Sequence, residues 1–209
     1  MEQLSKKIHN KPERKIKIMQ FGEGNFLRAF IEWILQDLND KGAINADVVV
    51  VQPMPLGRVK DIAAQDGLYT LRLEGIDKGE RVKKSEIIDV IGDCVNPFTD
   101  YEKFLRYGES EDLQIVISNT TEAGIALDET DTDFTVCPKS FPGKLLALLK
   151  RRYDKFGGAE DKGLAIVPCE LIDNNGDELY RVLTELAKIN KMDEKFIEWM
   201  QTANHFTST

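Results

Sequence analysis

Close to its amino end the chain changes from one hydrophobic period to another. Residues 15–21 form a short apolar run of strand length, and from residue 26 onward apolar side chains recur at the spacing of one helix face. That predicted apolar face consists of Phe26, Phe30, Trp33, Ile34 and Leu38. Gly22 and Gly24 separate the two periods, where the chain must reverse tightly. The pattern predicts a strand, a glycine turn and a helix.

Strand and helix periods continue to alternate along the rest of the chain. Val48 to Val51 is an unbroken apolar run, which is typical of a parallel sheet buried on both faces. Similar runs occupy residues 113–118 and 164–168, and helical periods occupy residues 140–156, 179–189 and 193–203. These elements predict an α/β fold with a mostly parallel sheet.

One segment departs from this alternation. Residues 68–74 alternate apolar and polar positions, and residues 81–90 are also rich in β-prone side chains. The turn-like stretch 75–79 lies between them. We therefore expect a β-hairpin inserted after the second strand.

The glycine turn is the first candidate for chemistry. A strand, a Gly-x-Gly turn and a helix start are how a dinucleotide pyrophosphate is held, because the helix start offers unpaired N–H groups, so an anion is expected at Gly24, Asn25 and Phe26. A full fingerprint has a third glycine where this chain has Leu27. A turn without a ligand therefore stays open as an alternative. Arg28 could reach a phosphate or a substrate carboxylate, or be an ordinary exposed helix arginine.

Two strand ends supply further candidates. Dinucleotide folds usually place an acidic residue at the end of the second strand to bind ribose hydroxyls, whereas this chain has Gln52. Glutamine can bond a ribose without repelling a 2′-phosphate, so the choice between NAD and NADP is left open. Asn119, Thr120 and Glu122 follow a later buried strand and are candidates for cofactor contact, with a plain polar turn as the alternative.

The net charge argues against some classes of binding partner. The 209 residues carry a net charge of −8, with 31% charged and 42% hydrophobic residues, which argues against nucleic acid or an anionic membrane as the main partner. The basic run Lys150 to Arg152 is interpreted as the solvated face of the helix at 140–156. A soluble globular protein that takes small molecules fits this composition best.

The cysteines and histidines indicate the redox environment of the protein and whether a metal site is expected. Three cysteines without a Cys-x-x-Cys pair favour a reducing, cytoplasmic setting. The two histidines, His9 and His205, lie at opposite ends of the chain, so no metal site is expected. Residues 1–14 are predicted to form a polar arm and residues 15–209 a single cofactor-binding domain.

Five motifs together resemble a known family. Residues 21–30, 48–51, 118–124, 168–176 and 199–209 resemble the long-chain mannitol dehydrogenase family, and within it the tagaturonate reductases, also called altronate oxidoreductases. The resemblance implies a Rossmann-like, doubly wound domain that binds NAD and serves the interconversion of tagaturonate and altronate. Mannitol or fructuronate oxidoreduction, or a non-catalytic dinucleotide-binding module, are the alternatives.

The resemblance also implies roles for residues. The glycine turn would carry the pyrophosphate, and residues 119–122 would flank the nicotinamide side. Asn175 matches a family asparagine that helps to polarise the substrate oxygen. The catalytic lysine of the family, with an asparagine and a histidine, lies in a mostly helical C-terminal domain that this sequence lacks, and neither Lys162 nor His205 is assigned that role. The chain is therefore expected to bind cofactor without turning over a sugar-acid substrate, and to have that domain as its partner.

Overall fold

A parallel six-stranded sheet organises the molecule. The computed structural model describes residues 4–121 and 124–209. The strands of the sheet are β1 (Ile16–Phe21), β2 (Asp47–Val51), β5 (Ile91–Val95), β6 (Ile115–Ser118), β7 (Ala165–Pro168) and β8 (His205–Phe206). They lie in the order β5-β2-β1-β6-β7-β8, with every neighbouring pair parallel. The order reverses between β1 and β6, which is the switch point of a doubly wound fold.

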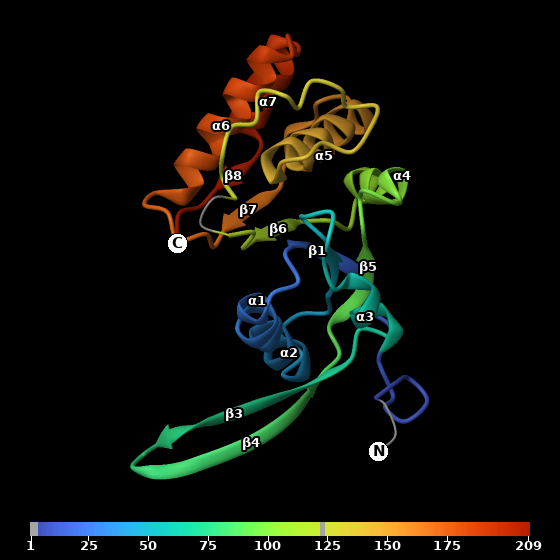
Figure 1. The fold of residues 1–209 in the computed structure, drawn as a ribbon, viewed down its shortest axis with the longest axis vertical. Coiled ribbons are helices and arrows are strands. Elements are labelled where there is room, and N and C mark those ends of the chain that lie inside the picture. The colour runs from blue at the N-terminus through green and yellow to red at the C-terminus, as the bar shows by residue number, and fades with distance from the viewer. Residues whose placement is uncertain (1–3, 122–123) are drawn as a thin grey trace.

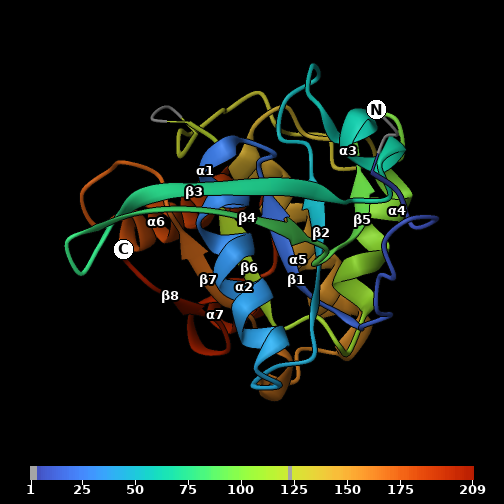
Figure 2. The same cartoon turned by 90° about the horizontal axis from the view of Figure 1, so that it is seen from below.

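Helices cover both faces of this sheet (Figures 1 and 2). They are α1 (Asn25–Ala29), α2 (Ile31–Asp40), α3 (Val59–Ala64), α4 (Tyr101–Arg106), α5 (Phe141–Phe156), α6 (Asn175–Ile189) and α7 (Glu194–Thr202), with short 3₁₀ turns η1 (Tyr107–Glu109) and η2 (Glu160–Lys162). One apolar cluster joins the sheet to α4, α5, α6 and α7, and a second joins it to α1, α3 and the base of the hairpin. The expected α/β fold is confirmed.

Alternate residues of β1 supply the two clusters. Met19 and Phe21 face α5, where the Phe21 and Phe141 ring centroids are 4.9 Å apart, whereas Ile18 faces the side of Leu27. All residues of β2 are buried, as the unbroken valine run predicts. The sheet therefore has no solvated face at its centre, and its free polar groups gather at the strand ends.

The predicted hairpin is present and projects from the body of the molecule (Figure 1). Strands β3 (Tyr69–Asp77) and β4 (Glu80–Ile88) pair from Tyr69↔Ile88 to Asp77↔Glu80. Lys78 and Gly79 have φ of 51° and 86°, the conformation of a two-residue hairpin turn. The turn is thus shorter than the expected 75–79, because Gly75 continues the strand opposite Val82.

The first helix differs from its prediction in two ways. It breaks at Phe30 into α1 and α2, and the predicted apolar face is largely turned outward: Phe26 and Phe30 are each 48% exposed. Leu27, Glu32 and Gln36 are buried instead. The helix does have a polar side, on which Arg28, Glu32 and Gln36 recur. Glu32 and Gln36 are buried because they bond to Gln20, Tyr69 and the N–H of Asp89, so the apolar face was not the one turned inward.

The basic run of α5 also differs from its prediction. Arg152 is 2% exposed, and its guanidinium donates to backbone carbonyls of Gly108, Ser110, Leu113 and Lys162. The arginine therefore ties α5 to the two connections that precede β6 and β7, at the amino ends of the strands. Lys150 and Arg151 do face outward, where Lys150 pairs with Asp154 at 2.5 Å. Helix α3 and strands β5 and β8 were not predicted.

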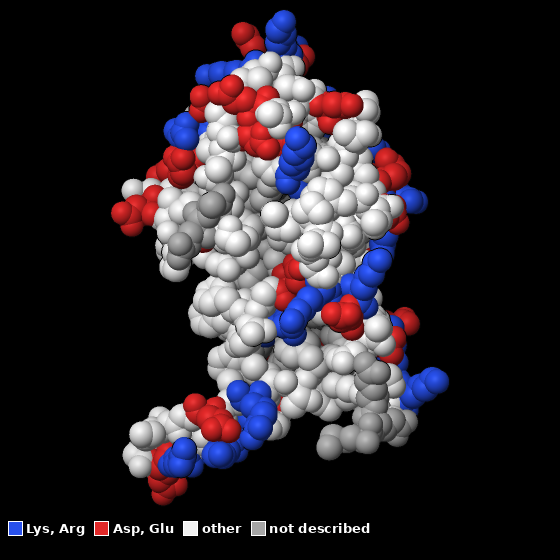
Figure 3. Space-filling model, viewed as in Figure 1, with Lys and Arg blue, Asp and Glu red and all other residues white. Residues whose placement is uncertain are grey.

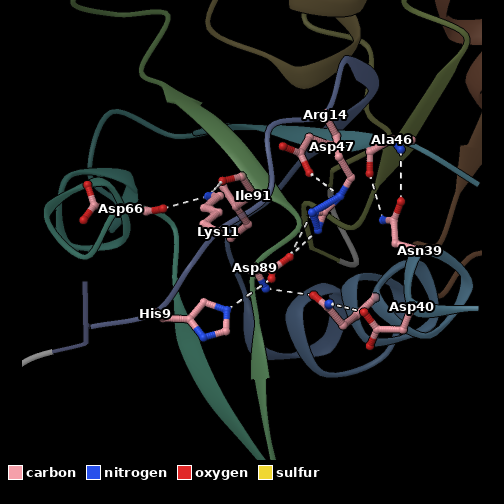
Figure 4. Close-up of polar contacts among 11 residues, drawn as sticks. His9, Lys11, Arg14, Asn39, Asp40, Ala46, Asp47, Asp66, Asp89 and Ile91 are labelled. Atoms are coloured by element: carbon pink, nitrogen blue, oxygen red, sulfur yellow. Dashed lines mark hydrogen bonds and ion pairs between the residues drawn. The ribbon is translucent and has the colours of Figure 1, made fainter. Parts of the chain in front are cut away.

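Residues 4–14 run along the edge of the sheet where β2 and β5 begin (Figure 4). Arg14 is ion-paired with Asp47 at 3.3 Å and with Asp89, and His9 Nε2 lies 3.2 Å from Asp89 Oδ2. Lys11 Nζ donates to the carbonyl oxygens of Asp66, at 2.7 Å, and Ile91. These contacts lie at the amino ends of the strands, opposite the glycine turn.

Charges of both signs are mixed on the surface. In Figure 3 basic and acidic side chains alternate along the hairpin, which carries the ion pairs Arg72–Glu74 and Lys84–Glu86. Within residues 4–121 and 124–209, no helix is long and apolar enough to cross a membrane. Over the same residues, no group of three or more His, Cys, Asp or Glu side chains is placed to hold a metal ion.

Candidate cofactor site

Gly22 shapes the turn after β1. Its N–H donates to the carbonyl of Val51 at 3.0 Å, and its φ is 117°, a conformation that L side chains rarely adopt. A Cβ here would lie 2.6 Å from the carbonyl oxygen of Asn119. Only glycine therefore lets the turn lie against the segment that follows β6.

Gly24 presents the opposite case. Its φ of −69° is open to any residue, and a Cβ there would meet no atom within 4 Å. No hydrogen bond among the described residues uses the N–H groups of Asn25, Phe26 or Leu27 at the start of α1. The backbone conformation does not require glycine at position 24. The space beside its Cα is open and lies next to the unused N–H groups of residues 25–27. A bound pyrophosphate fits this cradle.

A buried polar network supports the turn from below. Gln20 Nε2 donates to the carbonyl of Gly22 at 2.9 Å and to Glu32 Oε1 at 2.8 Å. The hydroxyl of Tyr69, at the base of the hairpin, donates to Glu32 Oε2 at 2.8 Å. Glu32 is fully buried, and this burial raises its pKa to about 7 in spite of the two hydrogen bonds. Sequence reasoning missed all three residues.

Arg28 folds back onto the turn. Its Nε donates to the carbonyl of Glu23 at 3.1 Å, one terminal nitrogen donates to Asn25 Oδ1 at 2.7 Å, and the guanidinium lies over the Tyr69 ring at 5.5 Å. It lines a pocket of about 160 Å³ together with Arg58 and Asp61. The residue is thus half-buried beside the candidate cofactor position and is not a free surface arginine.

Gln52 stabilises its own loop. The side chain is 2% exposed, and its Nε2 donates to the carbonyls of Met54 at 2.8 Å and Pro55 at 3.1 Å. Only the amide oxygen is left as an acceptor for a ribose hydroxyl. The carboxylate of Glu23 also lies at this strand end, where its Oε1 accepts the N–H of Arg58, and sequence reasoning did not single it out.

The ends of β6 and β7 are joined through polar side chains. Asn119 Nδ2 donates to the carbonyl of Cys169 at 2.6 Å. Glu170, 2% exposed, accepts hydrogen bonds from Ser118 Oγ and from both the N–H and Oγ1 of Thr120, each at 3.0 Å. This holds Asn119 and Thr120 at the carboxyl edge of the sheet beside Gly22. Glu122 lies outside the described residues.

Residues 16–209 match the family model of the mannitol dehydrogenase Rossmann domain. The chain belongs to the mannitol dehydrogenase family. Altronate oxidoreductase of Bacillus subtilis is 44% identical over 213 residues, covering 100% of this chain and 44% of the relative. Altronate oxidoreductase of Bacteroides thetaiotaomicron is 44% identical over 203 residues, covering 97% of this chain and 42% of the relative. The chain thus spans less than half the length of these curated relatives.

A solved dehydrogenase structure has the same fold. Mannitol 2-dehydrogenase of Pseudomonas fluorescens, in a ternary complex with NAD and D-mannitol, matches with a TM-score of 0.77 and 20% identity, over 93% of this chain and 41% of that one. The Rossmann-like, doubly wound architecture expected from the family motifs is therefore confirmed.

Two residues lie apart from the cofactor edge of this mannitol dehydrogenase family domain. Lys162 in η2 and His205 in β8 lie at the amino ends of β7 and β8. The glycine turn follows the carboxyl end of β1, so both residues lie at the opposite ends of the strands.

Asn175 does not present its amide to a substrate in this structure. The residue is 0% exposed, and its Nδ2 is bonded to the carbonyls of Pro168 and Glu170 and to Thr209 Oγ1, each at 3.0 Å. Its Oδ1 accepts the N–H of Thr209 at 3.1 Å. These contacts anchor the start of α6 to the end of β7, so the geometry does not support the predicted polarising role.

Proposed function

We propose that this chain is the NAD-binding half of an oxidoreductase that interconverts tagaturonate and altronate. The observation that carries the cofactor assignment is the turn at Gly24, where the chain leaves open space and free N–H groups that it does not itself use. The identity of 44% to an altronate oxidoreductase over the whole chain supports this substrate pair over mannitol or fructuronate.

We expect the ends of three strands to bind different parts of the cofactor. The turn from Gly22 to Phe26 would hold the pyrophosphate, the loop after Gln52 the adenosine half, and Asn119 with Thr120 the nicotinamide half. When bound, NAD supplies the acceptor or donor of hydride for the ketone and secondary alcohol pair. Gln20 and Glu32 fix the Gly22 carbonyl, and Glu170 fixes Thr120, so both sides of the site are held before a ligand arrives.

The remaining groups of the reaction are proposed to lie elsewhere. The curated relatives extend well beyond the 44% that this chain matches. We assign the groups that bind the substrate oxygen and move its proton to that remaining part. The 209-residue chain is then expected to oxidise no NADH in the presence of tagaturonate. A steady loss of NADH absorbance that depends on tagaturonate would contradict this division.

A thermal melt tests the cofactor site. At NADH concentrations of 100 times Kd, binding should add about 2.7 kcal/mol, which raises Tm by about 5 to 10 °C in a domain of this size. Gly24→Asp places a carboxylate in the cradle and should abolish the shift while leaving the melt without ligand unchanged.

Gly75→Asp is the matched control. Gly75 also has no positive φ and no atom within 4 Å of a built Cβ, but it lies in the hairpin. This variant should keep the full NADH shift. No shift in the wild-type chain, or an equal shift in the Gly24 variant, would overturn the proposed cofactor site.

A further inference from the structure

The carboxylate of Glu23 stands at the end of β2 although the residue belongs to the glycine turn after β1. Its Oε1 accepts the backbone N–H of Arg58 at 3.1 Å. A Cβ at Gly57 would lie 2.2 Å from this oxygen and 2.6 Å from Cδ of Gln52. Glu23, Gln52 and Gly57 therefore meet at one point, and the absence of a side chain at position 57 leaves the room that the carboxylate occupies.

This is the point at which doubly wound folds bind the ribose of adenosine. The usual device is an acidic residue that ends β2 and accepts hydrogen bonds from the ribose hydroxyls. Here the corresponding side chain is Gln52, whose amide nitrogen is used by the carbonyls of its own loop. The carboxylate missing from β2 is thus supplied at the same place by another strand end.

We propose that Glu23 binds the diol of the adenosine ribose and makes the site select NAD over NADP, an inference that rests on the proposed NAD site. No described residue donates to Glu23 Oε2, so this oxygen is left to accept a ribose hydroxyl. A 2′-phosphate at the same place would bring negative charge against the carboxylate and displace the hydroxyl donor.

Neighbouring charges make Glu23 the deciding group. Arg58 is exposed and lines the pocket with Arg28 and Asp61, so its guanidinium would favour a 2′-phosphate. Arg28 is engaged with the carbonyl of Glu23 and with Asn25. The carboxylate of Glu23 opposes Arg58. When Glu23 is replaced by glutamine, the arginine remains and the preference should move toward the phosphorylated cofactor.

The test measures dissociation constants of NADH and NADPH by nucleotide fluorescence for the wild-type chain, Glu23→Gln and Asp61→Asn. Loss of one charged acceptor should weaken NADH about tenfold in Glu23→Gln. NADPH should bind this variant more tightly, also by about tenfold, because a like charge is gone. Asp61→Asn removes a carboxylate from the pocket that Arg28 and Arg58 line, of which Glu23 is not a lining residue, and should leave the NADH to NADPH ratio unchanged. Adding Arg58→Gln to Glu23→Gln should reverse the gain in NADPH affinity.

The outcomes separate this inference from the proposed function. If wild type and Glu23→Gln bind NADH with the same preference over NADPH, Glu23 does not select the ribose, and the NAD site stands. If Asp61→Asn shifts the ratio and Glu23→Gln does not, the selecting carboxylate is the other one. If the wild-type chain binds neither nucleotide, both proposals fall. Unchanged urea unfolding of each variant shows that its fold is intact.

Discussion

Glu32 is an acid enclosed between β1, α2 and the base of the hairpin. It receives hydrogen bonds from Gln20 and Tyr69, and Gln20 Oε1 is a buried acceptor to which no described residue donates. Arg28 and Lys11 are the cations that favour its charged form, but burial dominates and raises its pKa to about 7. A folded-state pKa above the unfolded value means that the native state binds the proton more tightly.

The stability of the chain should accordingly fall as pH rises through the pKa of Glu32. Between pH 5 and pH 8 this residue should cost about 2 to 3 kcal/mol of the free energy of unfolding. Glu32→Gln keeps the shape, cannot ionise and can donate to Gln20 Oε1, so its stability should lack this fall. Urea unfolding at the two pH values measures the difference between variant and wild type.

Glu198→Gln is the control for that experiment. Glu198 lies on the exposed side of α7, so its replacement should change neither the stability nor its pH dependence by more than about 0.5 kcal/mol. Parallel pH profiles of wild type and Glu32→Gln would show that Glu32 is not the titrating group.

Residue roles were the part that the sequence predicted least well. Gly22 and Gly24 were found because a turn between two periods leaves a visible pattern. Arg152 was placed on the surface because its partners are backbone carbonyls, which leave no mark in the sequence. The Gln20–Glu32–Tyr69 network joins residues far apart in the chain, so no local spacing could reveal it. The burial of Asn175 likewise depends on a contact with Thr209.

At the scale of elements, α5 shows how a helix start is fixed by a loop. Ser140 Oγ accepts the N–H of Gly143 at 2.9 Å and donates to Asp131 Oδ2 at 2.6 Å. Asp131, 4% exposed, also accepts the N–H groups of Lys139 and Ser140. The cap therefore secures both the helix and the long connection from β6.

Ser140→Ala removes the cap hydroxyl and one partner of a buried carboxylate. The expected loss is about 1 to 2 kcal/mol in the free energy of unfolding. Ser140→Thr retains the hydroxyl and should stay within about 0.5 kcal/mol of wild type. Urea unfolding at neutral pH compares the three proteins, and equal midpoints for Ala and wild type would show that the cap contributes nothing.

Strands and long helices were predictable because their burial imposes a period. Strands buried on both faces of a parallel sheet are rich in apolar residues, as residues 48–51 of β2 are, and this run was predicted from the sequence. The helix face of α1 and α2 was wrong because part of its polar side, Glu32 and Gln36, is buried against polar partners from distant parts of the chain. Helix α3, of 6 residues, and strand β8, of 2 residues, are too short to show any period.

At the scale of the whole molecule, the amino ends and the carboxyl ends of the strands carry different kinds of contacts. Arg14, Asp47 and Asp89 join the amino-terminal segment to the edge where β2 and β5 begin, and Arg152 ties α5 to the loops before β6 and β7. The other edge gathers the glycine turn, Glu23 and the ends of β6 and β7. The amino-end ion pairs and the Arg152 contacts thus lie away from the candidate ligand contacts, so they can be altered with the candidate site left intact, whereas Glu32 and Glu170 support the candidate site itself.

The hairpin is a site where the backbone can be cleaved while the two fragments stay associated in the native fold. β2 and β5, the sheet strands on either side of it in sequence, are paired with each other, so the pieces before and after Gly79 are held side by side by the main sheet. The tip at Lys78 and Gly79 is exposed and remote from the body (Figure 1). Chains cut there should reassemble as complementary fragments. NADH fluorescence would then report whether two proteins fused to the fragments have met.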